Sequence, residues 1–237
     1  MKKSGAVAVM VLLAALSVLP GSAESDVYIE GYMGGGTVHD TSTPIGIGGA
    51  FPDTPGKINS FFTGGVKLGT WFDRTGFMAG SNWPEWTKYL GFYFDFNYHN
   101  IDFDTQTLGG IPGVDWSSRG RAATLAFMFA ARYGFMPDSA VPFGRVQPYL
   151  AVGPAVVFSW QEPTIVGLSA GNKSSTDLAL AVEAGIRFMA LKNVSLDLSF
   201  KYRWVEPKYD YDFGGIPVTL DPTYHIFIGA LGAAYHF

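Results

Sequence analysis

Residues 90–99, Leu-Gly-Phe-Tyr-Phe-Asp-Phe-Asn-Tyr-His, alternate strictly between two kinds of side chain. The even positions are aliphatic or aromatic, whereas the odd positions hold Gly91, Tyr93, Asp95, Asn97 and His99. Successive side chains of a β-strand point to opposite faces, so this pattern predicts a strand with one apolar and one more polar face. Ten residues is also about the length of a tilted strand that crosses a bilayer.

The same alternation recurs in seven further segments, which begin near residues 27, 62, 124, 147, 178, 196 and 227. In each, one face is large and apolar, and the other carries small residues with one or two charges. A soluble β-sandwich would instead turn a strongly polar face to water. Small residues with a few charges suit the narrow interior of an eight-stranded barrel, and a sheet in lipid must close. The sequence therefore predicts an all-β fold, an eight-stranded antiparallel up-and-down transmembrane β-barrel, rather than a soluble β-sandwich.

The composition of the 237-residue chain agrees with an exterior that faces lipid. Charged residues make up 15% and aromatic residues 16%, whereas soluble domains carry about 25% charged residues. A net charge of −4 argues against nucleic-acid binding. The absence of Cys excludes a disulfide scaffold and a thiolate metal site. The glycines at 34–36 precede no Gly-Lys-Ser/Thr motif, so neither a cofactor nor a metal is expected.

Residues 1–23 have the features of a secretory signal peptide. Lys2 and Lys3 precede an apolar stretch at 6–19, and Gly21-Ser22-Ala23 supplies small residues for cleavage. An uncleaved membrane anchor is the alternative, although this stretch is shorter than the roughly 20 residues a spanning helix needs. We expect residues 24–237 to form the barrel domain.

The connections between the predicted strands alternate in length. Four long polar segments, 37–58, 101–121, 160–176 and 205–222, alternate with 73–88, 134–145 and 191–193. Outer-membrane barrels have long outer loops and short periplasmic turns. The long segments are therefore predicted to be outer loops that offer a surface for a ligand. Within 73–88, Trp83, Pro84 and Trp86 predict an interfacial helical turn.

Charged residues at inward-facing positions form the main candidate site. They are Glu30, Lys67, Asp95, Arg132, Glu183, Arg187, Asp197, Lys201 and Arg203. A buried charge is costly unless it is paired, and these four acids nearly balance the five bases. The sequence predicts an ion-pair network that plugs the lumen. The alternative is a narrow, gated ion path through rearranging pairs.

Three stretches resemble the small outer-membrane β-barrel family of OmpA-like and opacity-porin-like domains. They are residues 147–153, residues 183–203 with Glu-Ala-Gly-Ile-Arg at their start, and the ending at 229–237. The resemblance implies a place in the bacterial outer membrane, surrounded by its lipid. It also implies an assembly signal read by the barrel-assembly machinery, formed by Phe227, Leu231, Tyr235 and Phe237.

Two features depart from the family pattern. Pro154 falls in mid-strand, where a missing N–H donor predicts a bulge or an irregular edge. Ile226 and Ile228 occupy inward positions, where small polar residues are more usual.

The favoured function is a structural or interaction barrel without enzymatic activity. The alternatives are a narrow porin-like channel for ions or small hydrophobic molecules and, less favoured, a lipid-modifying hydrolase. Such a hydrolase needs a Ser beside a His that an acid orients. His99 precedes Asp102 and Asp104, but no Ser is near it in sequence. The run at 209–212, Tyr-Asp-Tyr-Asp, is interpreted as a solvated acidic loop, with attraction of a cation or a basic partner as the alternative.

Overall fold

The computed structural model describes residues 27–40, 45–47, 58–72, 83–107, 113, 115–169, 171–213 and 216–237. The predicted signal peptide lies outside these residues. Eight long strands dominate the described part of the chain. They are β1 (Val27–Asp40), β3 (Phe61–Trp71), β4 (Leu90–Asn100), β6 (Asp115–Arg132), β7 (Val146–Ile165), β9 (Lys173–Met189), β10 (Val194–Val205) and β13 (Tyr224–His236).

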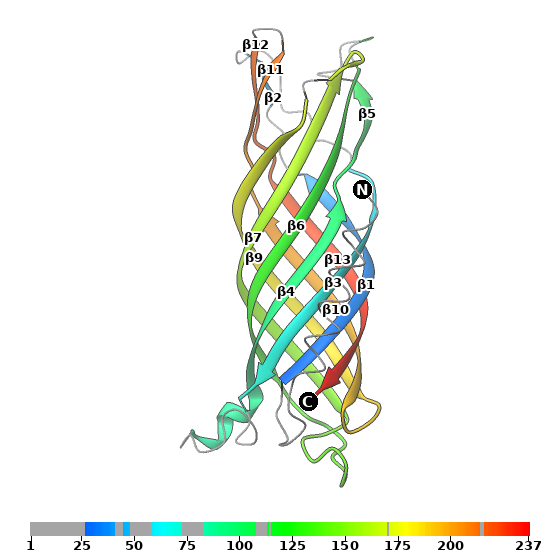
Figure 1. The fold of residues 1–237 in the computed structure, drawn as a ribbon, viewed down its shortest axis with the longest axis vertical. Helices are drawn as coiled ribbons and strands as arrows, with labels where there is room; N and C mark the ends of the chain where they lie inside the picture. Colours follow the sequence, from blue (N-terminus) through cyan, green and yellow to red (C-terminus); the bar gives the residue numbers. More distant parts are fainter. Residues whose placement is uncertain are drawn as a thin grey trace.

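These strands close into a barrel, with β1 starting and β13 ending at its lower end (Figure 1). Each strand pairs antiparallel with the next along the chain, and β13 pairs back onto β1 from Tyr28↔His236 to Asp40↔Tyr224. Each of the eight strands therefore has a hydrogen-bonded neighbour on both sides. A sheet in lipid requires this, because no water is available to its backbone groups. The predicted eight-stranded antiparallel barrel is confirmed.

The two faces of the wall follow the alternation in the sequence. In β4, Phe94 and Phe96 are exposed on the outside, while Asp95 and Asn97 are buried inside. Ile226 and Ile228 do face the interior, where both are fully buried. No helix among the described residues is long and apolar enough to span a membrane.

Smaller elements lie at the two ends of the barrel. The outer end carries β5 (Phe103–Thr107), β8 (Leu168–Ser169) and a separate sheet in the order β11 (Tyr209–Phe213), β12 (Ile216–Leu220), β2 (Ile45–Ile47), at the top of Figure 1. The opposite end carries η2, a 3-10 helix at Glu85–Tyr89, which confirms a helical turn in this connection.

The outer segments contain more strand than the sequence predicts. The sequence predicts loops at 101–121 and 160–176, but β6 and β7 remain paired out to Trp116↔Ile165. Beyond the lipid, strands need no apolar face, so their polar composition resembles that of loops. The outer rim is therefore an extension of the barrel wall.

Of the two outcomes predicted at Pro154, the bulge is wrong, whereas an irregular strand edge is found. Pro154 pairs in register with Leu180 on β9, and the β6–β7 register is the same at Ala126↔Ala155 and Phe129↔Val152. The proline and its neighbour interrupt the ladder on the β6 side without inserting a residue. A Cβ at Gly153 would collide with the Phe127 carbonyl oxygen, so glycine allows the two strands to approach here.

Candidate functional site

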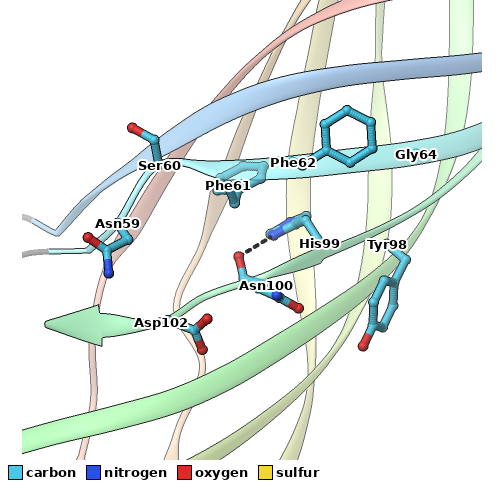
Figure 2. Close-up of a pocket in the computed structure, with 9 residues that line it drawn as sticks. All are labelled: Asn59, Ser60, Phe61, Phe62, Gly64, Tyr98, His99, Asn100 and Asp102. Atoms are coloured by element: carbon cyan, nitrogen blue, oxygen red, sulfur yellow. Dashed lines mark hydrogen bonds between the residues drawn. The ribbon is translucent and has the colours of Figure 1, made fainter.

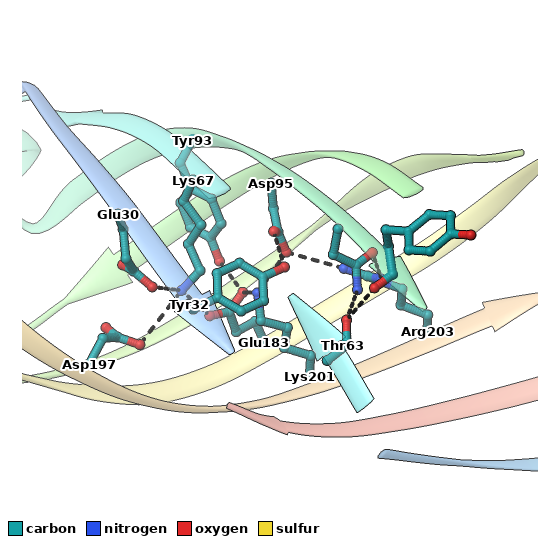
Figure 3. A network of polar contacts seen from close by, with 12 residues as sticks. Glu30, Tyr32, Thr63, Lys67, Tyr93, Asp95, Glu183, Asp197, Lys201 and Arg203 are labelled. Carbon is teal, nitrogen blue, oxygen red and sulfur yellow. Dashed lines mark hydrogen bonds and ion pairs between the residues drawn. The ribbon is translucent and has the colours of Figure 1, made fainter. Parts of the chain in front are cut away.

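A cluster of buried charged side chains lies inside the barrel (Figure 3). Its charged members among the described residues are four acids and four bases, each 2% exposed or less. They are Glu30, Asp95, Glu183, Asp197, Lys67, Arg187, Lys201 and Arg203. We call this set the lumen cluster. Alternation places each of them inward, and the barrel geometry determines which of them meet.

Lys67 is the centre of one half of the lumen cluster. Its Nζ lies 2.8 Å from Glu30 Oε1, 2.7 Å from Glu183 Oε1 and 3.6 Å from Asp197 Oδ1. Arg187 approaches two of these acids, with Nη2 2.8 Å from Glu30 Oε2 and Nε 3.4 Å from Asp197 Oδ2. Two cations thus hold three carboxylates together.

Asp95 is the centre of the other half. Its Oδ2 lies 2.8 Å from Lys201 Nζ and 3.2 Å from Arg203 Nη2. Arg203 also donates a hydrogen bond to the Asn97 side-chain oxygen. Lys201 Nζ lies 3.5 Å from Glu183 Oε2, which connects the two halves into one network.

Inward tyrosines complete the coordination of the carboxylates. Tyr32 donates to Asp95 Oδ1 over 2.6 Å, and Tyr93 donates to Glu183 Oε2 over 2.9 Å. The Tyr149 hydroxyl lies 2.8 Å from both Glu183 Oε1 and Asp197 Oδ1. Charge-assisted hydrogen bonds of this kind offset part of the desolvation cost of the buried acids. Alternation in the sequence places Tyr93 on the same face as Asp95, but the pattern gives these tyrosines no part in the network.

Arg132, the ninth predicted residue, lies apart from the lumen cluster at the short-turn end. Its Nη1 donates to Gln147 Oε1 over 3.1 Å, and its guanidinium lies 4.2 Å from the Trp71 ring centroid and 4.1 Å from that of Phe143. Stacking on two rings covers the guanidinium where the lumen approaches the periplasmic side.

The outer end of the lumen contains a second set of polar contacts. Tyr209 of β11 donates to Ser159 Oγ over 2.6 Å, and Tyr211 donates to the Gln161 carbonyl over 3.2 Å. Burial raises the pKa of both phenols, so they stay protonated and act as donors. The interpretation of 209–212 as a solvated loop is therefore wrong for its tyrosines, although Asp210 is exposed.

No metal centre is found in the part of the chain that the structure describes. It contains no group of three or more His, Cys, Asp or Glu side chains that could hold an ion.

A Ser–His pair that the sequence did not suggest lies near the short-turn end. Ser195 Oγ lies 2.9 Å from His236 Nε2, because β10 and β13 are neighbouring strands. Both side chains are buried. The charged groups that act on His236 are the cations Arg187 and Arg132, whereas a catalytic triad needs an acid there. His99, the earlier candidate, stacks on Phe61 with ring centroids 4.3 Å apart.

A pocket of about 470 Å³ opens where β3 and β4 separate at their outer ends (Figure 2). The last ladder pair is Thr63↔His99, after which Asn59 N donates to the Asp102 carbonyl over 3.0 Å. The lining combines aromatic rings with amide, hydroxyl and carboxylate groups, including Asn59, Ser60, Phe61, Tyr98, Asn100 and Asp102. Both apolar and hydrogen-bonding surface is therefore available to a ligand.

A closed barrel with an apolar exterior and a polar interior defines the class of bacterial outer-membrane β-barrels. The chain belongs to the outer membrane protein beta-barrel domain family, whose model matches residues 6–237, and it is located in the bacterial outer membrane.

Comparison with solved structures finds outer-membrane proteins that are similar to this chain, and the first of those below shares its fold. The outer membrane protein OprG from Pseudomonas aeruginosa is similar with a TM-score of 0.57 and 15% identity, over 92% of this chain and 99% of that one. Ail, the attachment invasion locus protein of Yersinia pestis, gives a TM-score of 0.39 and 15% identity, over 90% and 99%. A search of curated proteins finds no match.

Proposed function

We propose that this protein is a non-enzymatic structural and interaction barrel whose lumen is closed by ion pairs. The observation that carries the proposal is that two of these ion pairs join strands on opposite sides of the barrel. In the ring of eight strands, β3 lies opposite β9 and β4 lies opposite β10. The pairs Lys67–Glu183 and Asp95–Lys201 therefore cross the full width of the lumen.

The charge balance of the lumen cluster also favours closure. Its four acids and four bases cancel among the described residues, and Tyr149 joins two of the carboxylates. An ion that passed would have to separate a buried pair, which leaves a charge without compensation. This arrangement favours a plug over the gated path.

Conductance tests this part of the proposal. Folded protein in a planar bilayer is expected to give no steady opening, and liposomes that contain it should not swell in permeant sugars. The matched variant Lys67→Met/Glu183→Gln removes one crossing pair and should conduct more than the wild type. Steady, large conductance from the wild type would overturn the plug and support a narrow channel.

Lipid hydrolysis tests the non-enzymatic part. The Ser195–His236 pair is buried beside cations, so neither side chain is arranged to attack an ester. We expect wild-type protein in phospholipid vesicles to release no free fatty acid. Release that disappears in Ser195→Ala would contradict the proposal.

The interaction part concerns the outer segments 37–58, 101–121, 160–176 and 205–222. Paired strands carry much of this surface: β6 and β7 extend through it, and β11 is held by Tyr209 and Tyr211. A partner would therefore meet preformed contacts, which reduces the ordering entropy lost on binding. Limited proteolysis of the folded protein tests this, because cleavage should spare 115–121 and 160–165.

A further inference from the structure

Two arginines of the barrel wall face outward. The described strands carry five arginines, of which Arg132, Arg187 and Arg203 are buried in the lumen. Arg119 and Arg121, both on β6, are exposed on the outside. Their orientation is unusual for a wall whose outer face is otherwise apolar over most of its height.

The position of Arg121 matches the boundary between lipid tails and headgroups. The same outward row of β6 continues toward the periplasm as Ala123, Leu125, Phe127 and Phe129. In register, Arg121 lies beside Trp160 on β7, and tryptophan favours the level of the headgroups. Arg119 lies one step further out.

Neither guanidinium is neutralised by a side chain in the described part of the chain. Among the described residues, Arg119 and Arg121 have no ion pair or hydrogen bond, in contrast to the arginines of the lumen cluster. Glu162 is the register partner of Arg119, but it accepts a hydrogen bond from Ser169 over 3.1 Å. Arg121 has the uncharged neighbours Asn100 and Trp160. A guanidinium binds a phosphate through two parallel hydrogen bonds.

The pocket between β3 and β4 adjoins these arginines. Asn100 of the pocket is the register partner of Arg121. Asp102 accepts a hydrogen bond from Gly120 N over 3.0 Å, and Ile101 N donates to the Gly120 carbonyl over 2.9 Å. Gly120 is the residue between the two arginines, so these bonds fix the pocket beside them.

The pocket lining matches the chemistry of a sugar ring. Phe62 and Tyr98, both exposed, offer apolar ring surface for the C–H groups of a sugar. Asn59, Asn100 and Asp102 offer donors and acceptors for its hydroxyls. Figure 2 draws these groups at the outer ends of β3 and β4. A ligand that used both the pocket and the arginines would contain a sugar and a phosphate.

We propose that this outer face binds a phosphorylated glycolipid of the outer leaflet, with its phosphate on Arg121 and Arg119 and a sugar in the β3–β4 pocket. The acyl chains then lie along the outward apolar side chains of β4 and β6, which include Phe94, Phe96, Leu125 and Phe127. The site faces the membrane sideways, so it is independent of whether the lumen conducts.

Lipopolysaccharide is the probe for this site. Folded protein is titrated with lipopolysaccharide, with its chemically dephosphorylated form and with phosphatidylglycerol, each in phosphatidylcholine vesicles. The variants are Arg121→Gln, Arg119→Gln/Arg121→Gln and Tyr98→Ala. Lys192→Gln, an exposed cation at the opposite end, controls for net charge. Retention of the folded gel mobility without heating confirms that each variant is assembled.

The expected result is that Arg121→Gln weakens lipopolysaccharide binding about tenfold, the loss of one charge-assisted contact, and the double variant more. Lys192→Gln should bind as the wild type does. The wild type should bind dephosphorylated lipopolysaccharide more weakly than lipopolysaccharide, by a similar factor. Arg121→Gln should then weaken binding of the dephosphorylated form little further. Tyr98→Ala should weaken binding of both forms.

Equal binding by the double variant and the wild type would overturn the proposal. Equal affinity for phosphatidylglycerol would overturn it as well, because that lipid carries a phosphate without a sugar.

Discussion

Lys67 Nζ lies 2.7 Å from Glu183 Oε1, although β3 and β9 stand on opposite sides of the barrel. Both side chains are 1% exposed, so neither charge reaches water. The pair thus connects two walls that share no backbone hydrogen bond. Its removal tests how far the lumen cluster holds the barrel together.

Replacing Lys67 with Met should destabilise the barrel strongly. The substitution leaves Glu30 and Glu183 with fewer compensating charges in the interior, and breaking a buried pair from one side costs about 3–5 kcal/mol. Urea unfolding in vesicles, followed by tryptophan fluorescence, measures the loss. The variant Lys67→Met/Glu183→Gln should recover part of it. Equal midpoints for Lys67→Met and the wild type would show that the pair is dispensable.

Substitutions at two glycines should differ sharply in their effect on the stability of the barrel. A Cβ at Gly153 would collide with the Phe127 carbonyl, whereas nothing lies within 4 Å of a Cβ at Gly31. Overpacking of this kind costs about 1–3 kcal/mol, so Gly153→Ala should lower the unfolding midpoint. Gly31→Ala should leave it nearly unchanged, which makes it the matched control. A neutral Gly153→Ala would mean that β6 and β7 can separate at Pro154 without cost.

Phe237→Ala should slow assembly in cells more than it lowers stability. The prediction rests on the proposed assembly signal at Phe227, Leu231, Tyr235 and Phe237. Phe237 N donates to the Val27 carbonyl over 3.0 Å, and the substitution keeps this backbone bond. Folded barrel in membranes is quantified by gel mobility shift, with spontaneous folding into vesicles as the second readout. Phe188→Ala, on an outward row elsewhere, is the control, and equal defects in both variants would argue against a signal.

The turn at 134–145 should depend on pH through Asp138. The Val141 amide, followed by the Arg145 side chain, holds the pKa of this carboxyl below its ordinary value. Because the folded-state pKa is lowered, the stabilisation is fully present at neutral pH and is lost as the pH falls through that lowered value. An NMR titration of the carboxyl measures it. Arg145→Gln should move the pKa upward, and an ordinary pKa in the wild type would contradict the prediction.

The sequence predicts the wall of this barrel well, because lipid imposes a constraint at every second residue. Phe94 must face out if Asp95 faces in, so alternation alone determines both faces of β4. The same logic placed Ile226 and Ile228 inside, where they are found. It also placed every member of the lumen cluster on the correct side.

The contacts across the lumen could not be predicted in the same way. Lys67 and Asp95 are register partners on neighbouring strands, yet the ion pairs of Asp95 are with Lys201 and Arg203. Which side chains meet depends on the stagger of the strands around the barrel. Turn lengths and register set that stagger, and they also set the meeting of Ser195 with His236.

The burial of the two tyrosines of β11 could not be predicted, because the alternating pattern around them is too short to indicate a strand. Tyr209 and Tyr211 alternate with Asp210, as a strand would require, but the flanking residues are polar and contain proline. Their burial results from contacts with Ser159 and Gln161 of β7. Such long-range contacts leave little trace in local sequence.

The 20 residues of β7 have a consequence for how the protein meets its surroundings. At about 3.3 Å per residue and a tilt of about 40°, the strand rises roughly 50 Å. The apolar band of such a barrel is only about 25 Å tall, so the tip stands well clear of the bilayer. There Val166 and Gly167, both with positive φ, form a tight turn into β8. The β7–β8 turn therefore projects into the aqueous phase, where it is accessible without contact with the lipid.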